Sequence, residues 1–285
     1  MRSPAYTAEL VERGYNNRAA VPDHPQWLAK FAELSANART ALRPITDLRY
    51  GPNPKETLDL FVPAGGSLGT LVFIHGGYWR ALDKSDHSFV ASPFVAQGFA
   101  VAVLNYDLCP DVSIATIVDE CRRAVAWLVG EGERHGAKPS PMVVSGHSAG
   151  GHLAAMLVTT PAEAFGLAQH PLAGAVSVSG VHDLRPLTLA SFNSELKLDD
   201  AEAARLSPIL QQPVARVPVV IAVGADETAE FLRQADLLWD AWPENRPAKM
   251  QRPLVVPERH HFSVVVDYAD ASSALTRASL ALLIR

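Results

Sequence analysis

From residue 70 onward the sequence alternates between short, continuously apolar runs and longer segments with a helical pattern of apolar residues. Short apolar runs bounded by turn signals predict strands that are buried on both faces. Helices between such strands predict a mostly parallel sheet with helices on both faces. The predicted strands are 71–74, 100–104, 142–145, 175–179, 217–223 and 251–256. The predicted helices are 83–97, 113–135, 149–159, 229–242 and 262–284.

Two segments before this alternation have other patterns. Residues 45–63 contain two alternating apolar–polar runs around the sequence Gly-Pro-Asn-Pro, which predicts a hairpin forming an antiparallel edge of the sheet. Residues 1–43 are predicted to form a helical extension. One apolar face of this extension is formed by the helically spaced residues Trp27, Leu28, Phe31 and Leu34.

Residues 184–213 interrupt the alternation between two predicted strands and are rich in Pro, Leu and Asp. We predict that they form a small helical cap over the carboxyl edge of the sheet, because long structured connections in compact domains are usually functional. A single α/β domain can reach this chain length. We therefore predict one domain over residues 1–285, with the extension 1–43 and the cap 184–213 as additions.

The sequence Gly146-His147-Ser148-Ala149-Gly150 has the pattern G-x-S-x-G between a predicted strand and a predicted helix. In a sharp strand-to-helix turn this pattern presents a serine hydroxyl above the edge of the sheet. The first N–H groups of the following helix point toward developing negative charge. We therefore predict that Ser148 is a nucleophile.

A serine nucleophile needs a base that is itself oriented by an acid, and after this kind of turn the acid precedes the histidine in the chain. Asp226 follows the predicted strand 217–223 at the reactive edge of a parallel sheet, and we predict it as the acid. Glu227 and Asp183 remain alternatives. His260 and His261 follow the next predicted strand, and we favour His261 as the base because it directly precedes Phe262 and the final helix.

A glycine-containing loop follows the first buried strand of the alternation. Its sequence, His75-Gly76-Gly77-Tyr78-Trp79, is a form of the loop that supplies backbone N–H groups to an oxyanion. We predict that Gly77 and Tyr78 donate, together with Ala149, and that Gly76 permits the close approach of the backbone. Tyr78 and Trp79 are also candidate substrate-binding residues, with core packing as the alternative. Phe192 and Asn193 in the predicted cap are weaker candidates of the same kind.

Composition and spacing argue against several other classes of protein. The formal net charge is −5 and no run of Lys or Arg is present, so we expect no nucleic-acid partner. We expect no membrane partner either, because no apolar stretch reaches the roughly 18 residues of a membrane span. The first residues lack the apolar segment of a secretory signal, and a cytoplasmic location is expected.

We expect neither a metal nor another cofactor. His75, His147 and His152 do not form a metal-binding motif. Cys109 and Cys121 lack the spacing of metal ligands, and we predict that both are small buried apolar residues.

Five separate motifs carry a family resemblance. They are HGGYW (75–79), GHSAGGHL (146–153), SGVHDLRPL (179–187), VGADETAEFLRQ (223–234) and HHF (260–262). Together they resemble the kynurenine formamidase, or arylformamidase, branch of the α/β-hydrolases over most of residues 45–270. The resemblance implies the α/β-hydrolase fold, a catalytic triad at Ser148, Asp226 and His261, and an oxyanion loop at residues 75–79. It also implies hydrolysis of N-formyl-kynurenine, another aryl formamide or a small acyl ester without a cofactor.

Two other functions stay open. One is that of a general short-chain carboxylesterase, which has the same triad and differs only in substrate. The other is a catalytically idle α/β-hydrolase that binds a ligand, although the ordered Ser, acid and His residues argue against it. The expected partner is a small aryl formamide or ester, and a homodimer is left open.

Overall fold

The computed structural model describes residues 6–284, which are built around an eight-stranded sheet of order β1-β2-β4-β3-β5-β6-β7-β8. Strands β1 (Ile45–Arg49) and β2 (Thr57–Phe61) form an antiparallel hairpin, and β2 pairs antiparallel with β4 (Ala100–Leu104). The remaining pairs are parallel. The prediction of a mostly parallel sheet with an antiparallel N-terminal hairpin is confirmed.

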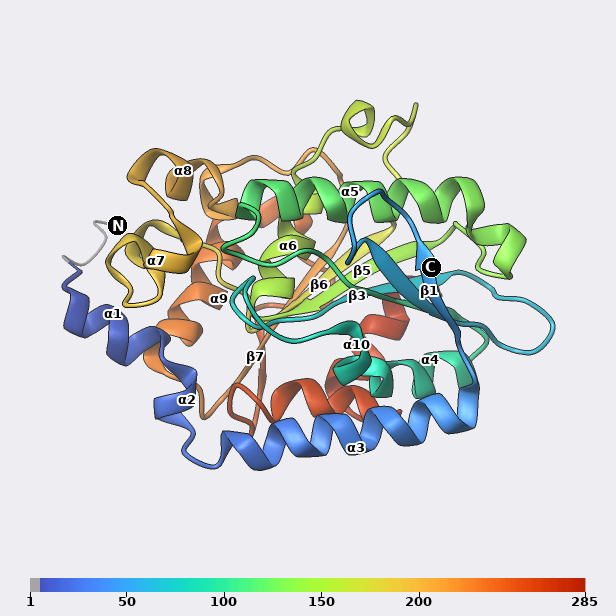
Figure 1. Cartoon of the computed structure of the whole chain (residues 1–285), viewed down its shortest axis with the longest axis horizontal. Coiled ribbons are helices and arrows are strands. Elements are labelled where there is room, and N and C mark those ends of the chain that lie inside the picture. Colours follow the sequence, from blue (N-terminus) through green and yellow to red (C-terminus); the bar gives the residue numbers. More distant parts are fainter. Residues whose placement is uncertain (1–5, 285) are drawn as a thin grey trace.

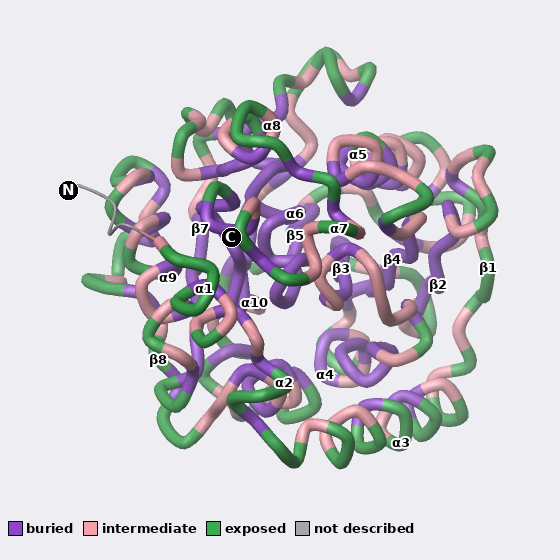
Figure 2. The backbone as a smooth tube through the Cα atoms, turned by 60° about the vertical axis from the view of Figure 1, so that its left-hand side comes forward, coloured by how far each residue is buried: buried purple, intermediate pink, exposed green. Residues whose placement is uncertain are grey.

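The other strands lie close to the predicted ranges. They are β3 (Thr70–Ile74), β5 (Met142–His147), β6 (Gly174–Val178), β7 (Val219–Gly224) and β8 (Leu254–Val256). Every residue of β3 through β7 is buried, which Figure 2 shows as purple strands in the centre of the molecule. Because helices cover both faces, both sets of alternating side chains must be apolar, and the sequence therefore shows continuous runs.

Helices cover the two faces of the sheet in separate groups (Figure 1). One face packs against α5 (Ile114–Glu131), α6 (Ala149–Val158) and α9 (Ala229–Ala241), and the other against α4 (Ala91–Ala96), α10 (Ala274–Leu283) and the N-terminal α3 (His24–Leu42). Strand β3 illustrates the division, because Val72 and Ile74 belong to the first core and Leu71 and Phe73 to the second.

Three predicted helices combine an α-helix with a 3-10 helix. Range 113–135 consists of α5 followed by η2 (Gly132–His135). Range 83–97 contains a 3-10 helix, η1 (Lys84–Val90), followed by α4. Range 262–284 divides into the 3-10 helix η7 (Val264–Ala269) and α10. Between η7 and α10, the Asp270 side chain accepts hydrogen bonds from the N–H and the hydroxyl of Ser272. The Ser273 side chain caps α10 by accepting a hydrogen bond from Thr276 N–H. These short polar side chains bind the backbone locally and therefore end a helix that apolar periodicity alone would continue.

The described part of the N-terminal extension is helical, with α1 (Ala8–Tyr15) and α2 (Asn17–Ala20) preceding α3. Helix α3 buries Phe31, while Trp27 packs edge-on against the ring of His260 at 4.9 Å. Helix α1 is fixed to the start of α9, because the Tyr15 hydroxyl donates to Glu230 Oε1 at 2.7 Å. The extension thereby reaches the carboxyl edge of the sheet.

The predicted cap segment follows β6 and folds into short helices. These are η4 (Arg185–Leu189), α7 (Asn193–Leu196), α8 (Asp200–Arg205) and η5 (Pro208–Leu210). Figure 1 shows α7 and α8 on the same side of the molecule as α1. Within residues 6–284, no helix has the length and apolar character needed to cross a membrane. The cytoplasmic location stays a prediction.

Candidate active site

The turn between β5 and α6 holds Ser148 in a strained backbone conformation, with φ 56° and ψ −117°. Few residues other than glycine adopt this region, and such strain is typical of functional sites. The turn is also very tight. A Cβ atom on Gly146 would lie 2.1 Å from the Gly150 carbonyl oxygen, and one on Gly150 would lie 2.0 Å from that of Ile74. The glycines of the motif are therefore required by backbone packing.

A chain of two hydrogen bonds joins Ser148 to a histidine and a carboxylate. His261 Nε2 lies 3.1 Å from Ser148 Oγ, and His261 Nδ1 lies 2.8 Å from Glu227 Oε2. All three residues are buried at the carboxyl edge of the sheet. This is the arrangement in which an oriented imidazole can accept a proton from a serine hydroxyl.

The prediction of Asp226 as the partner of this histidine is wrong, and Glu227 occupies that place. Glu227 N–H donates to the Gly224 carbonyl, so residues 224–227 form a turn whose central residues, Ala225 and Asp226, are exposed. The exposed Asp226 side chain therefore does not meet the buried His261. Glu227 instead returns to the sheet, where its Oε1 accepts from Gly224 N–H and from the Ser179 hydroxyl.

The other two alternatives lie outside this hydrogen-bond chain. Asp183 is buried but is paired with Arg185, whose Nε and Nη2 donate to its two oxygens at 2.8 and 2.9 Å. His260 Nδ1 accepts from the N–H of Ser263 at 3.2 Å, so it is used in the local turn. The preference for His261 over His260 agrees with this geometry.

The loop of residues 75–79 lies beside the serine turn. A Cβ atom on Gly76 would meet the His147 carbonyl oxygen at 2.8 Å and Ser148 Cβ at 3.1 Å. Gly77 and Tyr78 have positive φ values of 102° and 50°. Within residues 6–284, no backbone carbonyl accepts a hydrogen bond from the N–H of Gly77, Tyr78 or Ala149. These N–H groups are available to an oxyanion, as a donor role requires.

Tyr106 supports this loop from behind and was not identified from the sequence. Its buried hydroxyl donates to the carbonyl oxygen of His75 at 2.8 Å and lies 3.3 Å from that of Gly76, while its ring stacks on His75 at 4.2 Å. The C=O and N–H of a trans peptide point in opposite directions. Holding the Gly76 carbonyl therefore directs the Gly77 N–H away from Tyr106. The sequence signal that could have identified Tyr106 was its position just after β4. The parallel neighbour of β4 is β3, which ends at the loop of residues 75–79.

Replacing Tyr106 with phenylalanine is expected to lower kcat about tenfold with little change in KM, because the ring still packs but the peptide is held less firmly. Steady-state kinetics on any hydrolysed ester or formamide measures this effect. The buried Tyr268, whose hydroxyl bonds to Ser145 and Ser279, provides a matched control. Equal losses of kcat in Tyr106→Phe and Tyr268→Phe would indicate a general packing effect.

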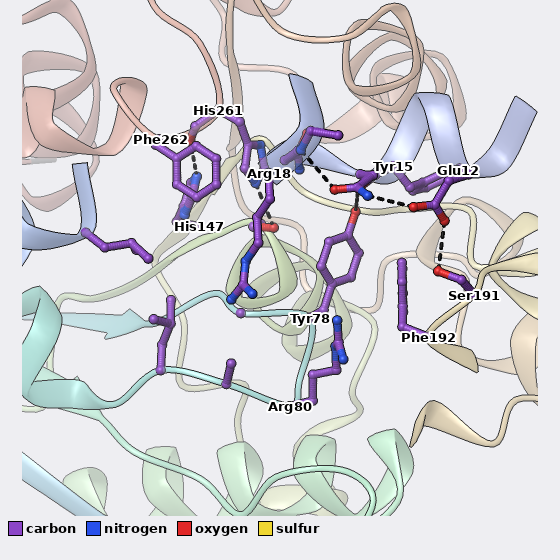
Figure 3. Close-up of a pocket in the computed structure, with 18 of the residues that line it drawn as sticks. Glu12, Tyr15, Arg18, Tyr78, Arg80, His147, Ser191, Phe192, His261 and Phe262 are labelled. Atoms are coloured by element: carbon purple, nitrogen blue, oxygen red, sulfur yellow. Dashed lines mark hydrogen bonds between the residues drawn. The ribbon is translucent and has the colours of Figure 1, made fainter. Parts of the chain in front are cut away.

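A cavity of about 600 Å³ opens beside Ser148 (Figure 3). The predicted lining residue Tyr78 is there, and its ring lies 4.6 Å from that of Phe192 in the cap segment. Phe262 contributes a further aromatic ring. The polar and charged residues from the N-terminal helices and the cap were missed, because their sequences carry no motif. They are Glu12, Asn16, Asn17, Arg18 and Ser191.

Trp79 does not line this cavity, and its prediction as a substrate-binding residue is wrong. Its side chain is fully buried and packs edge-on against the ring of His152 at 5.0 Å. Consecutive side chains of the turn point in different directions, so Tyr78 faces the cavity while Trp79 fills the core behind it. Asn193 also has a structural role, because its amide donates to the carbonyls of Thr188 and Leu198.

Four histidines outside the hydrogen-bond chain are completely buried. Burial lowers the pKa of His75 and His152 to about 4, and that of His87 and His182 to about 3, from the ordinary value of 6.5. Within residues 6–284, no group of three or more His, Cys, Asp or Glu side chains is arranged to hold a metal ion. The expectation of a metal-independent site stays a prediction.

These low pKa values predict that the protein loses stability in mild acid. The folded state favours the neutral form of each of these histidines. Their contribution to the free energy of unfolding is therefore fully present above about pH 6.5 and decreases as the pH falls toward 4. Urea unfolding at several pH values should show a decline to which each of these histidines contributes about 1.4 kcal/mol per pH unit. His152→Gln should make the decline shallower. An unfolding free energy that is constant from pH 7 to 4.5 would contradict this expectation.

The sheet topology, the strained serine turn after β5, and the carboxylate and histidine after β7 and β8 define an α/β-hydrolase. The BD-FAE family model matches residues 58–226. The kynurenine formamidase of Salmo salar is 30% identical over 255 residues, covering 87% of this chain and 85% of that protein. That of Danio rerio is 30% identical over 250 residues, covering 85% and 83%. The chain belongs to the BD-FAE family and is a kynurenine formamidase-like α/β-hydrolase.

Solved structures agree with this assignment. A crystal structure from Silicibacter sp. TM1040 with a provisional thioesterase name is 34% identical, with a TM-score of 0.83, covering 93% of this chain and 97% of that one. Esterase B from Lactobacillus rhamnosis has a TM-score of 0.66 at 19% identity, covering 95% and 94%, and shows the shared fold. The relatives support a hydrolase that acts on formamide or ester bonds.

Proposed function

We propose that this protein is a serine hydrolase that cleaves an aryl formamide such as N-formyl-kynurenine through a formyl-enzyme intermediate. The observation that carries this proposal is the hydrogen-bond chain from Glu227 through His261 to Ser148, which ends in a cavity with an aromatic wall. The similarity to kynurenine formamidases over most of the chain supports a formamide as the substrate.

The first half of the proposed reaction forms the formyl-enzyme. His261 Nε2 accepts the proton of the Ser148 hydroxyl while Oγ attacks the formyl carbon, and Glu227 stabilises the resulting imidazolium. The negative oxygen of the tetrahedral intermediate receives hydrogen bonds from the N–H groups of the oxyanion loop and of Ala149. His261 then gives its proton to the arylamine nitrogen as the carbon–nitrogen bond breaks.

The second half repeats these steps with water. His261 removes a proton from water, the hydroxide attacks the formyl ester on Ser148, and the ester bond breaks to release formic acid, which loses its proton to solvent to give formate. The proton returns to Ser148 Oγ, which restores the starting state. Protein groups and water therefore account for every proton in the reaction.

A substrate profile tests the proposal against the carboxylesterase alternative. We expect kcat/KM for N-formyl-L-kynurenine to exceed that for p-nitrophenyl acetate and for esters of longer acyl chains. A clear preference for the esters would favour a short-chain carboxylesterase. Absence of turnover on all substrates, together with absence of Ser148 labelling by a fluorophosphonate probe, would favour the catalytically idle alternative.

A further inference from the structure

The charged residues of the cavity differ in how they are paired. Arg80 forms an ion pair with Glu195, and its guanidinium lies over the ring of Phe192 at 5.1 Å. Arg18 also lines the cavity, but it has no hydrogen-bond or ion-pair partner within residues 6–284. A guanidinium carries five donors, so this side chain leaves a full set available for a ligand.

Among residues 6–284, the one carboxylate that lines the cavity already accepts hydrogen bonds. Glu12 accepts a hydrogen bond from Asn16 Nδ2 at 2.6 Å and another from the Ser191 hydroxyl at 2.8 Å. Figure 3 shows Glu12 on the far side of Tyr78 from Arg18. The positive charge of Arg18 is therefore not neutralised by this carboxylate.

The backbone that carries Arg18 is anchored before α2 and capped at its start. Before it, Gly14 O accepts a hydrogen bond from the Thr228 hydroxyl at 2.7 Å. The side chain of Asn16 caps α2 by accepting from Ala19 N–H at 3.0 Å. Figure 3 shows the Arg18 side chain extending from α2 across the cavity, between His261 and Tyr78. Arg18 is an exposed residue that lines the same cavity as Ser148.

We propose that Arg18 binds a carboxylate of the substrate and gives the cavity a preference for aryl substrates that carry a carboxylate over those that lack one. This inference rests on the proposed function, because the aryl formamide N-formyl-kynurenine carries a carboxylate at its amino-acid end. A guanidinium matches a carboxylate with two parallel N–H···O bonds, which a single ammonium group does not reproduce. The aromatic wall at Tyr78 and Phe192 contacts the aryl ring, and Arg18 contacts the acid.

The test compares N-formyl-L-kynurenine with 2-formamidoacetophenone, which has the same aryl formamide and ketone but lacks the ammonium and carboxylate of the amino-acid group. The measured quantity is the ratio of their kcat/KM values. In Arg18→Gln this ratio should fall about 10- to 100-fold, mainly through KM, which corresponds to the loss of a hydrogen bond to a charged group. Arg18→Lys should have a ratio between those of Arg18→Gln and the wild-type protein. Arg13→Gln, which removes an arginine from α1 outside this cavity, should leave the ratio unchanged.

The outcomes separate this inference from the proposed function. An unchanged ratio in Arg18→Gln would overturn the role of Arg18, even if the wild-type protein hydrolyses both formamides. If the wild-type protein hydrolyses neither formamide, the proposed function fails, and 4-acetoxybenzoate against phenyl acetate then provides the same charged–neutral comparison. Labelling of Ser148 by a fluorophosphonate probe confirms in each variant that the site is intact.

Discussion

The Ser148→Ala variant is expected to fold normally and to lose about 10⁴- to 10⁶-fold in kcat on formamides and esters alike, the range seen when a serine nucleophile is removed. Within residues 6–284, no other hydroxyl or thiol forms a hydrogen bond with His261 Nε2, so the described part of the chain provides no replacement nucleophile in the same position. Alanine also removes a hydroxyl without adding atoms to the tight turn, so a loss of activity would not arise from steric conflict.

Two measurements check this expectation. Initial rates at saturating substrate give kcat, and a fluorophosphonate probe should label the wild-type protein but not the variant. Ser272→Ala, at an exposed turn, is a suitable control. Turnover near the wild-type level in a folded Ser148→Ala protein would rule out a mechanism in which Ser148 is the nucleophile.

The second large effect distinguishes two neighbouring carboxylates. Glu227→Gln is expected to lower kcat about 10³- to 10⁴-fold, as in other triads whose acid becomes an amide. Glu227 Oε1 accepts hydrogen bonds from Gly224 N–H and from the Ser179 hydroxyl, so the amide oxygen of glutamine should take that position. Its NH₂ group would then face His261 Nδ1. This selects the tautomer with a proton on Nε2, which cannot accept the proton of Ser148.

Asp226→Asn is the matched control, because it makes the same chemical change one residue away on an exposed side chain. We expect its kcat to stay within about twofold of the wild-type value, in line with the small effects of surface substitutions. Measurement of kcat for Glu227→Gln and Asp226→Asn at the same pH tests this expectation. A larger loss in Asp226→Asn than in Glu227→Gln would contradict the observed pairing of His261.

Local signals in the sequence were sufficient for most of the fold. The apolar runs that became β3 to β7 are continuous because both faces of the sheet are buried, and this property is visible without coordinates. The sequence around Ser148 predicted its turn, because steric limits at Gly146 and Gly150 act between atoms close in the chain or on the adjacent strand. These features depend on periodicity and short-range geometry, which a single sequence records.

The sequence by itself therefore determined the sheet, the strained serine and the histidine that follows the last strand. Only the tertiary structure decided that Glu227 rather than Asp226 meets His261, because a turn sets the direction of each side chain and both residues are acids. It also decided that Arg18 enters the cavity and that Trp79 does not. Contacts between segments far apart in the chain arise from packing of the whole molecule, and no local pattern of residues specifies them.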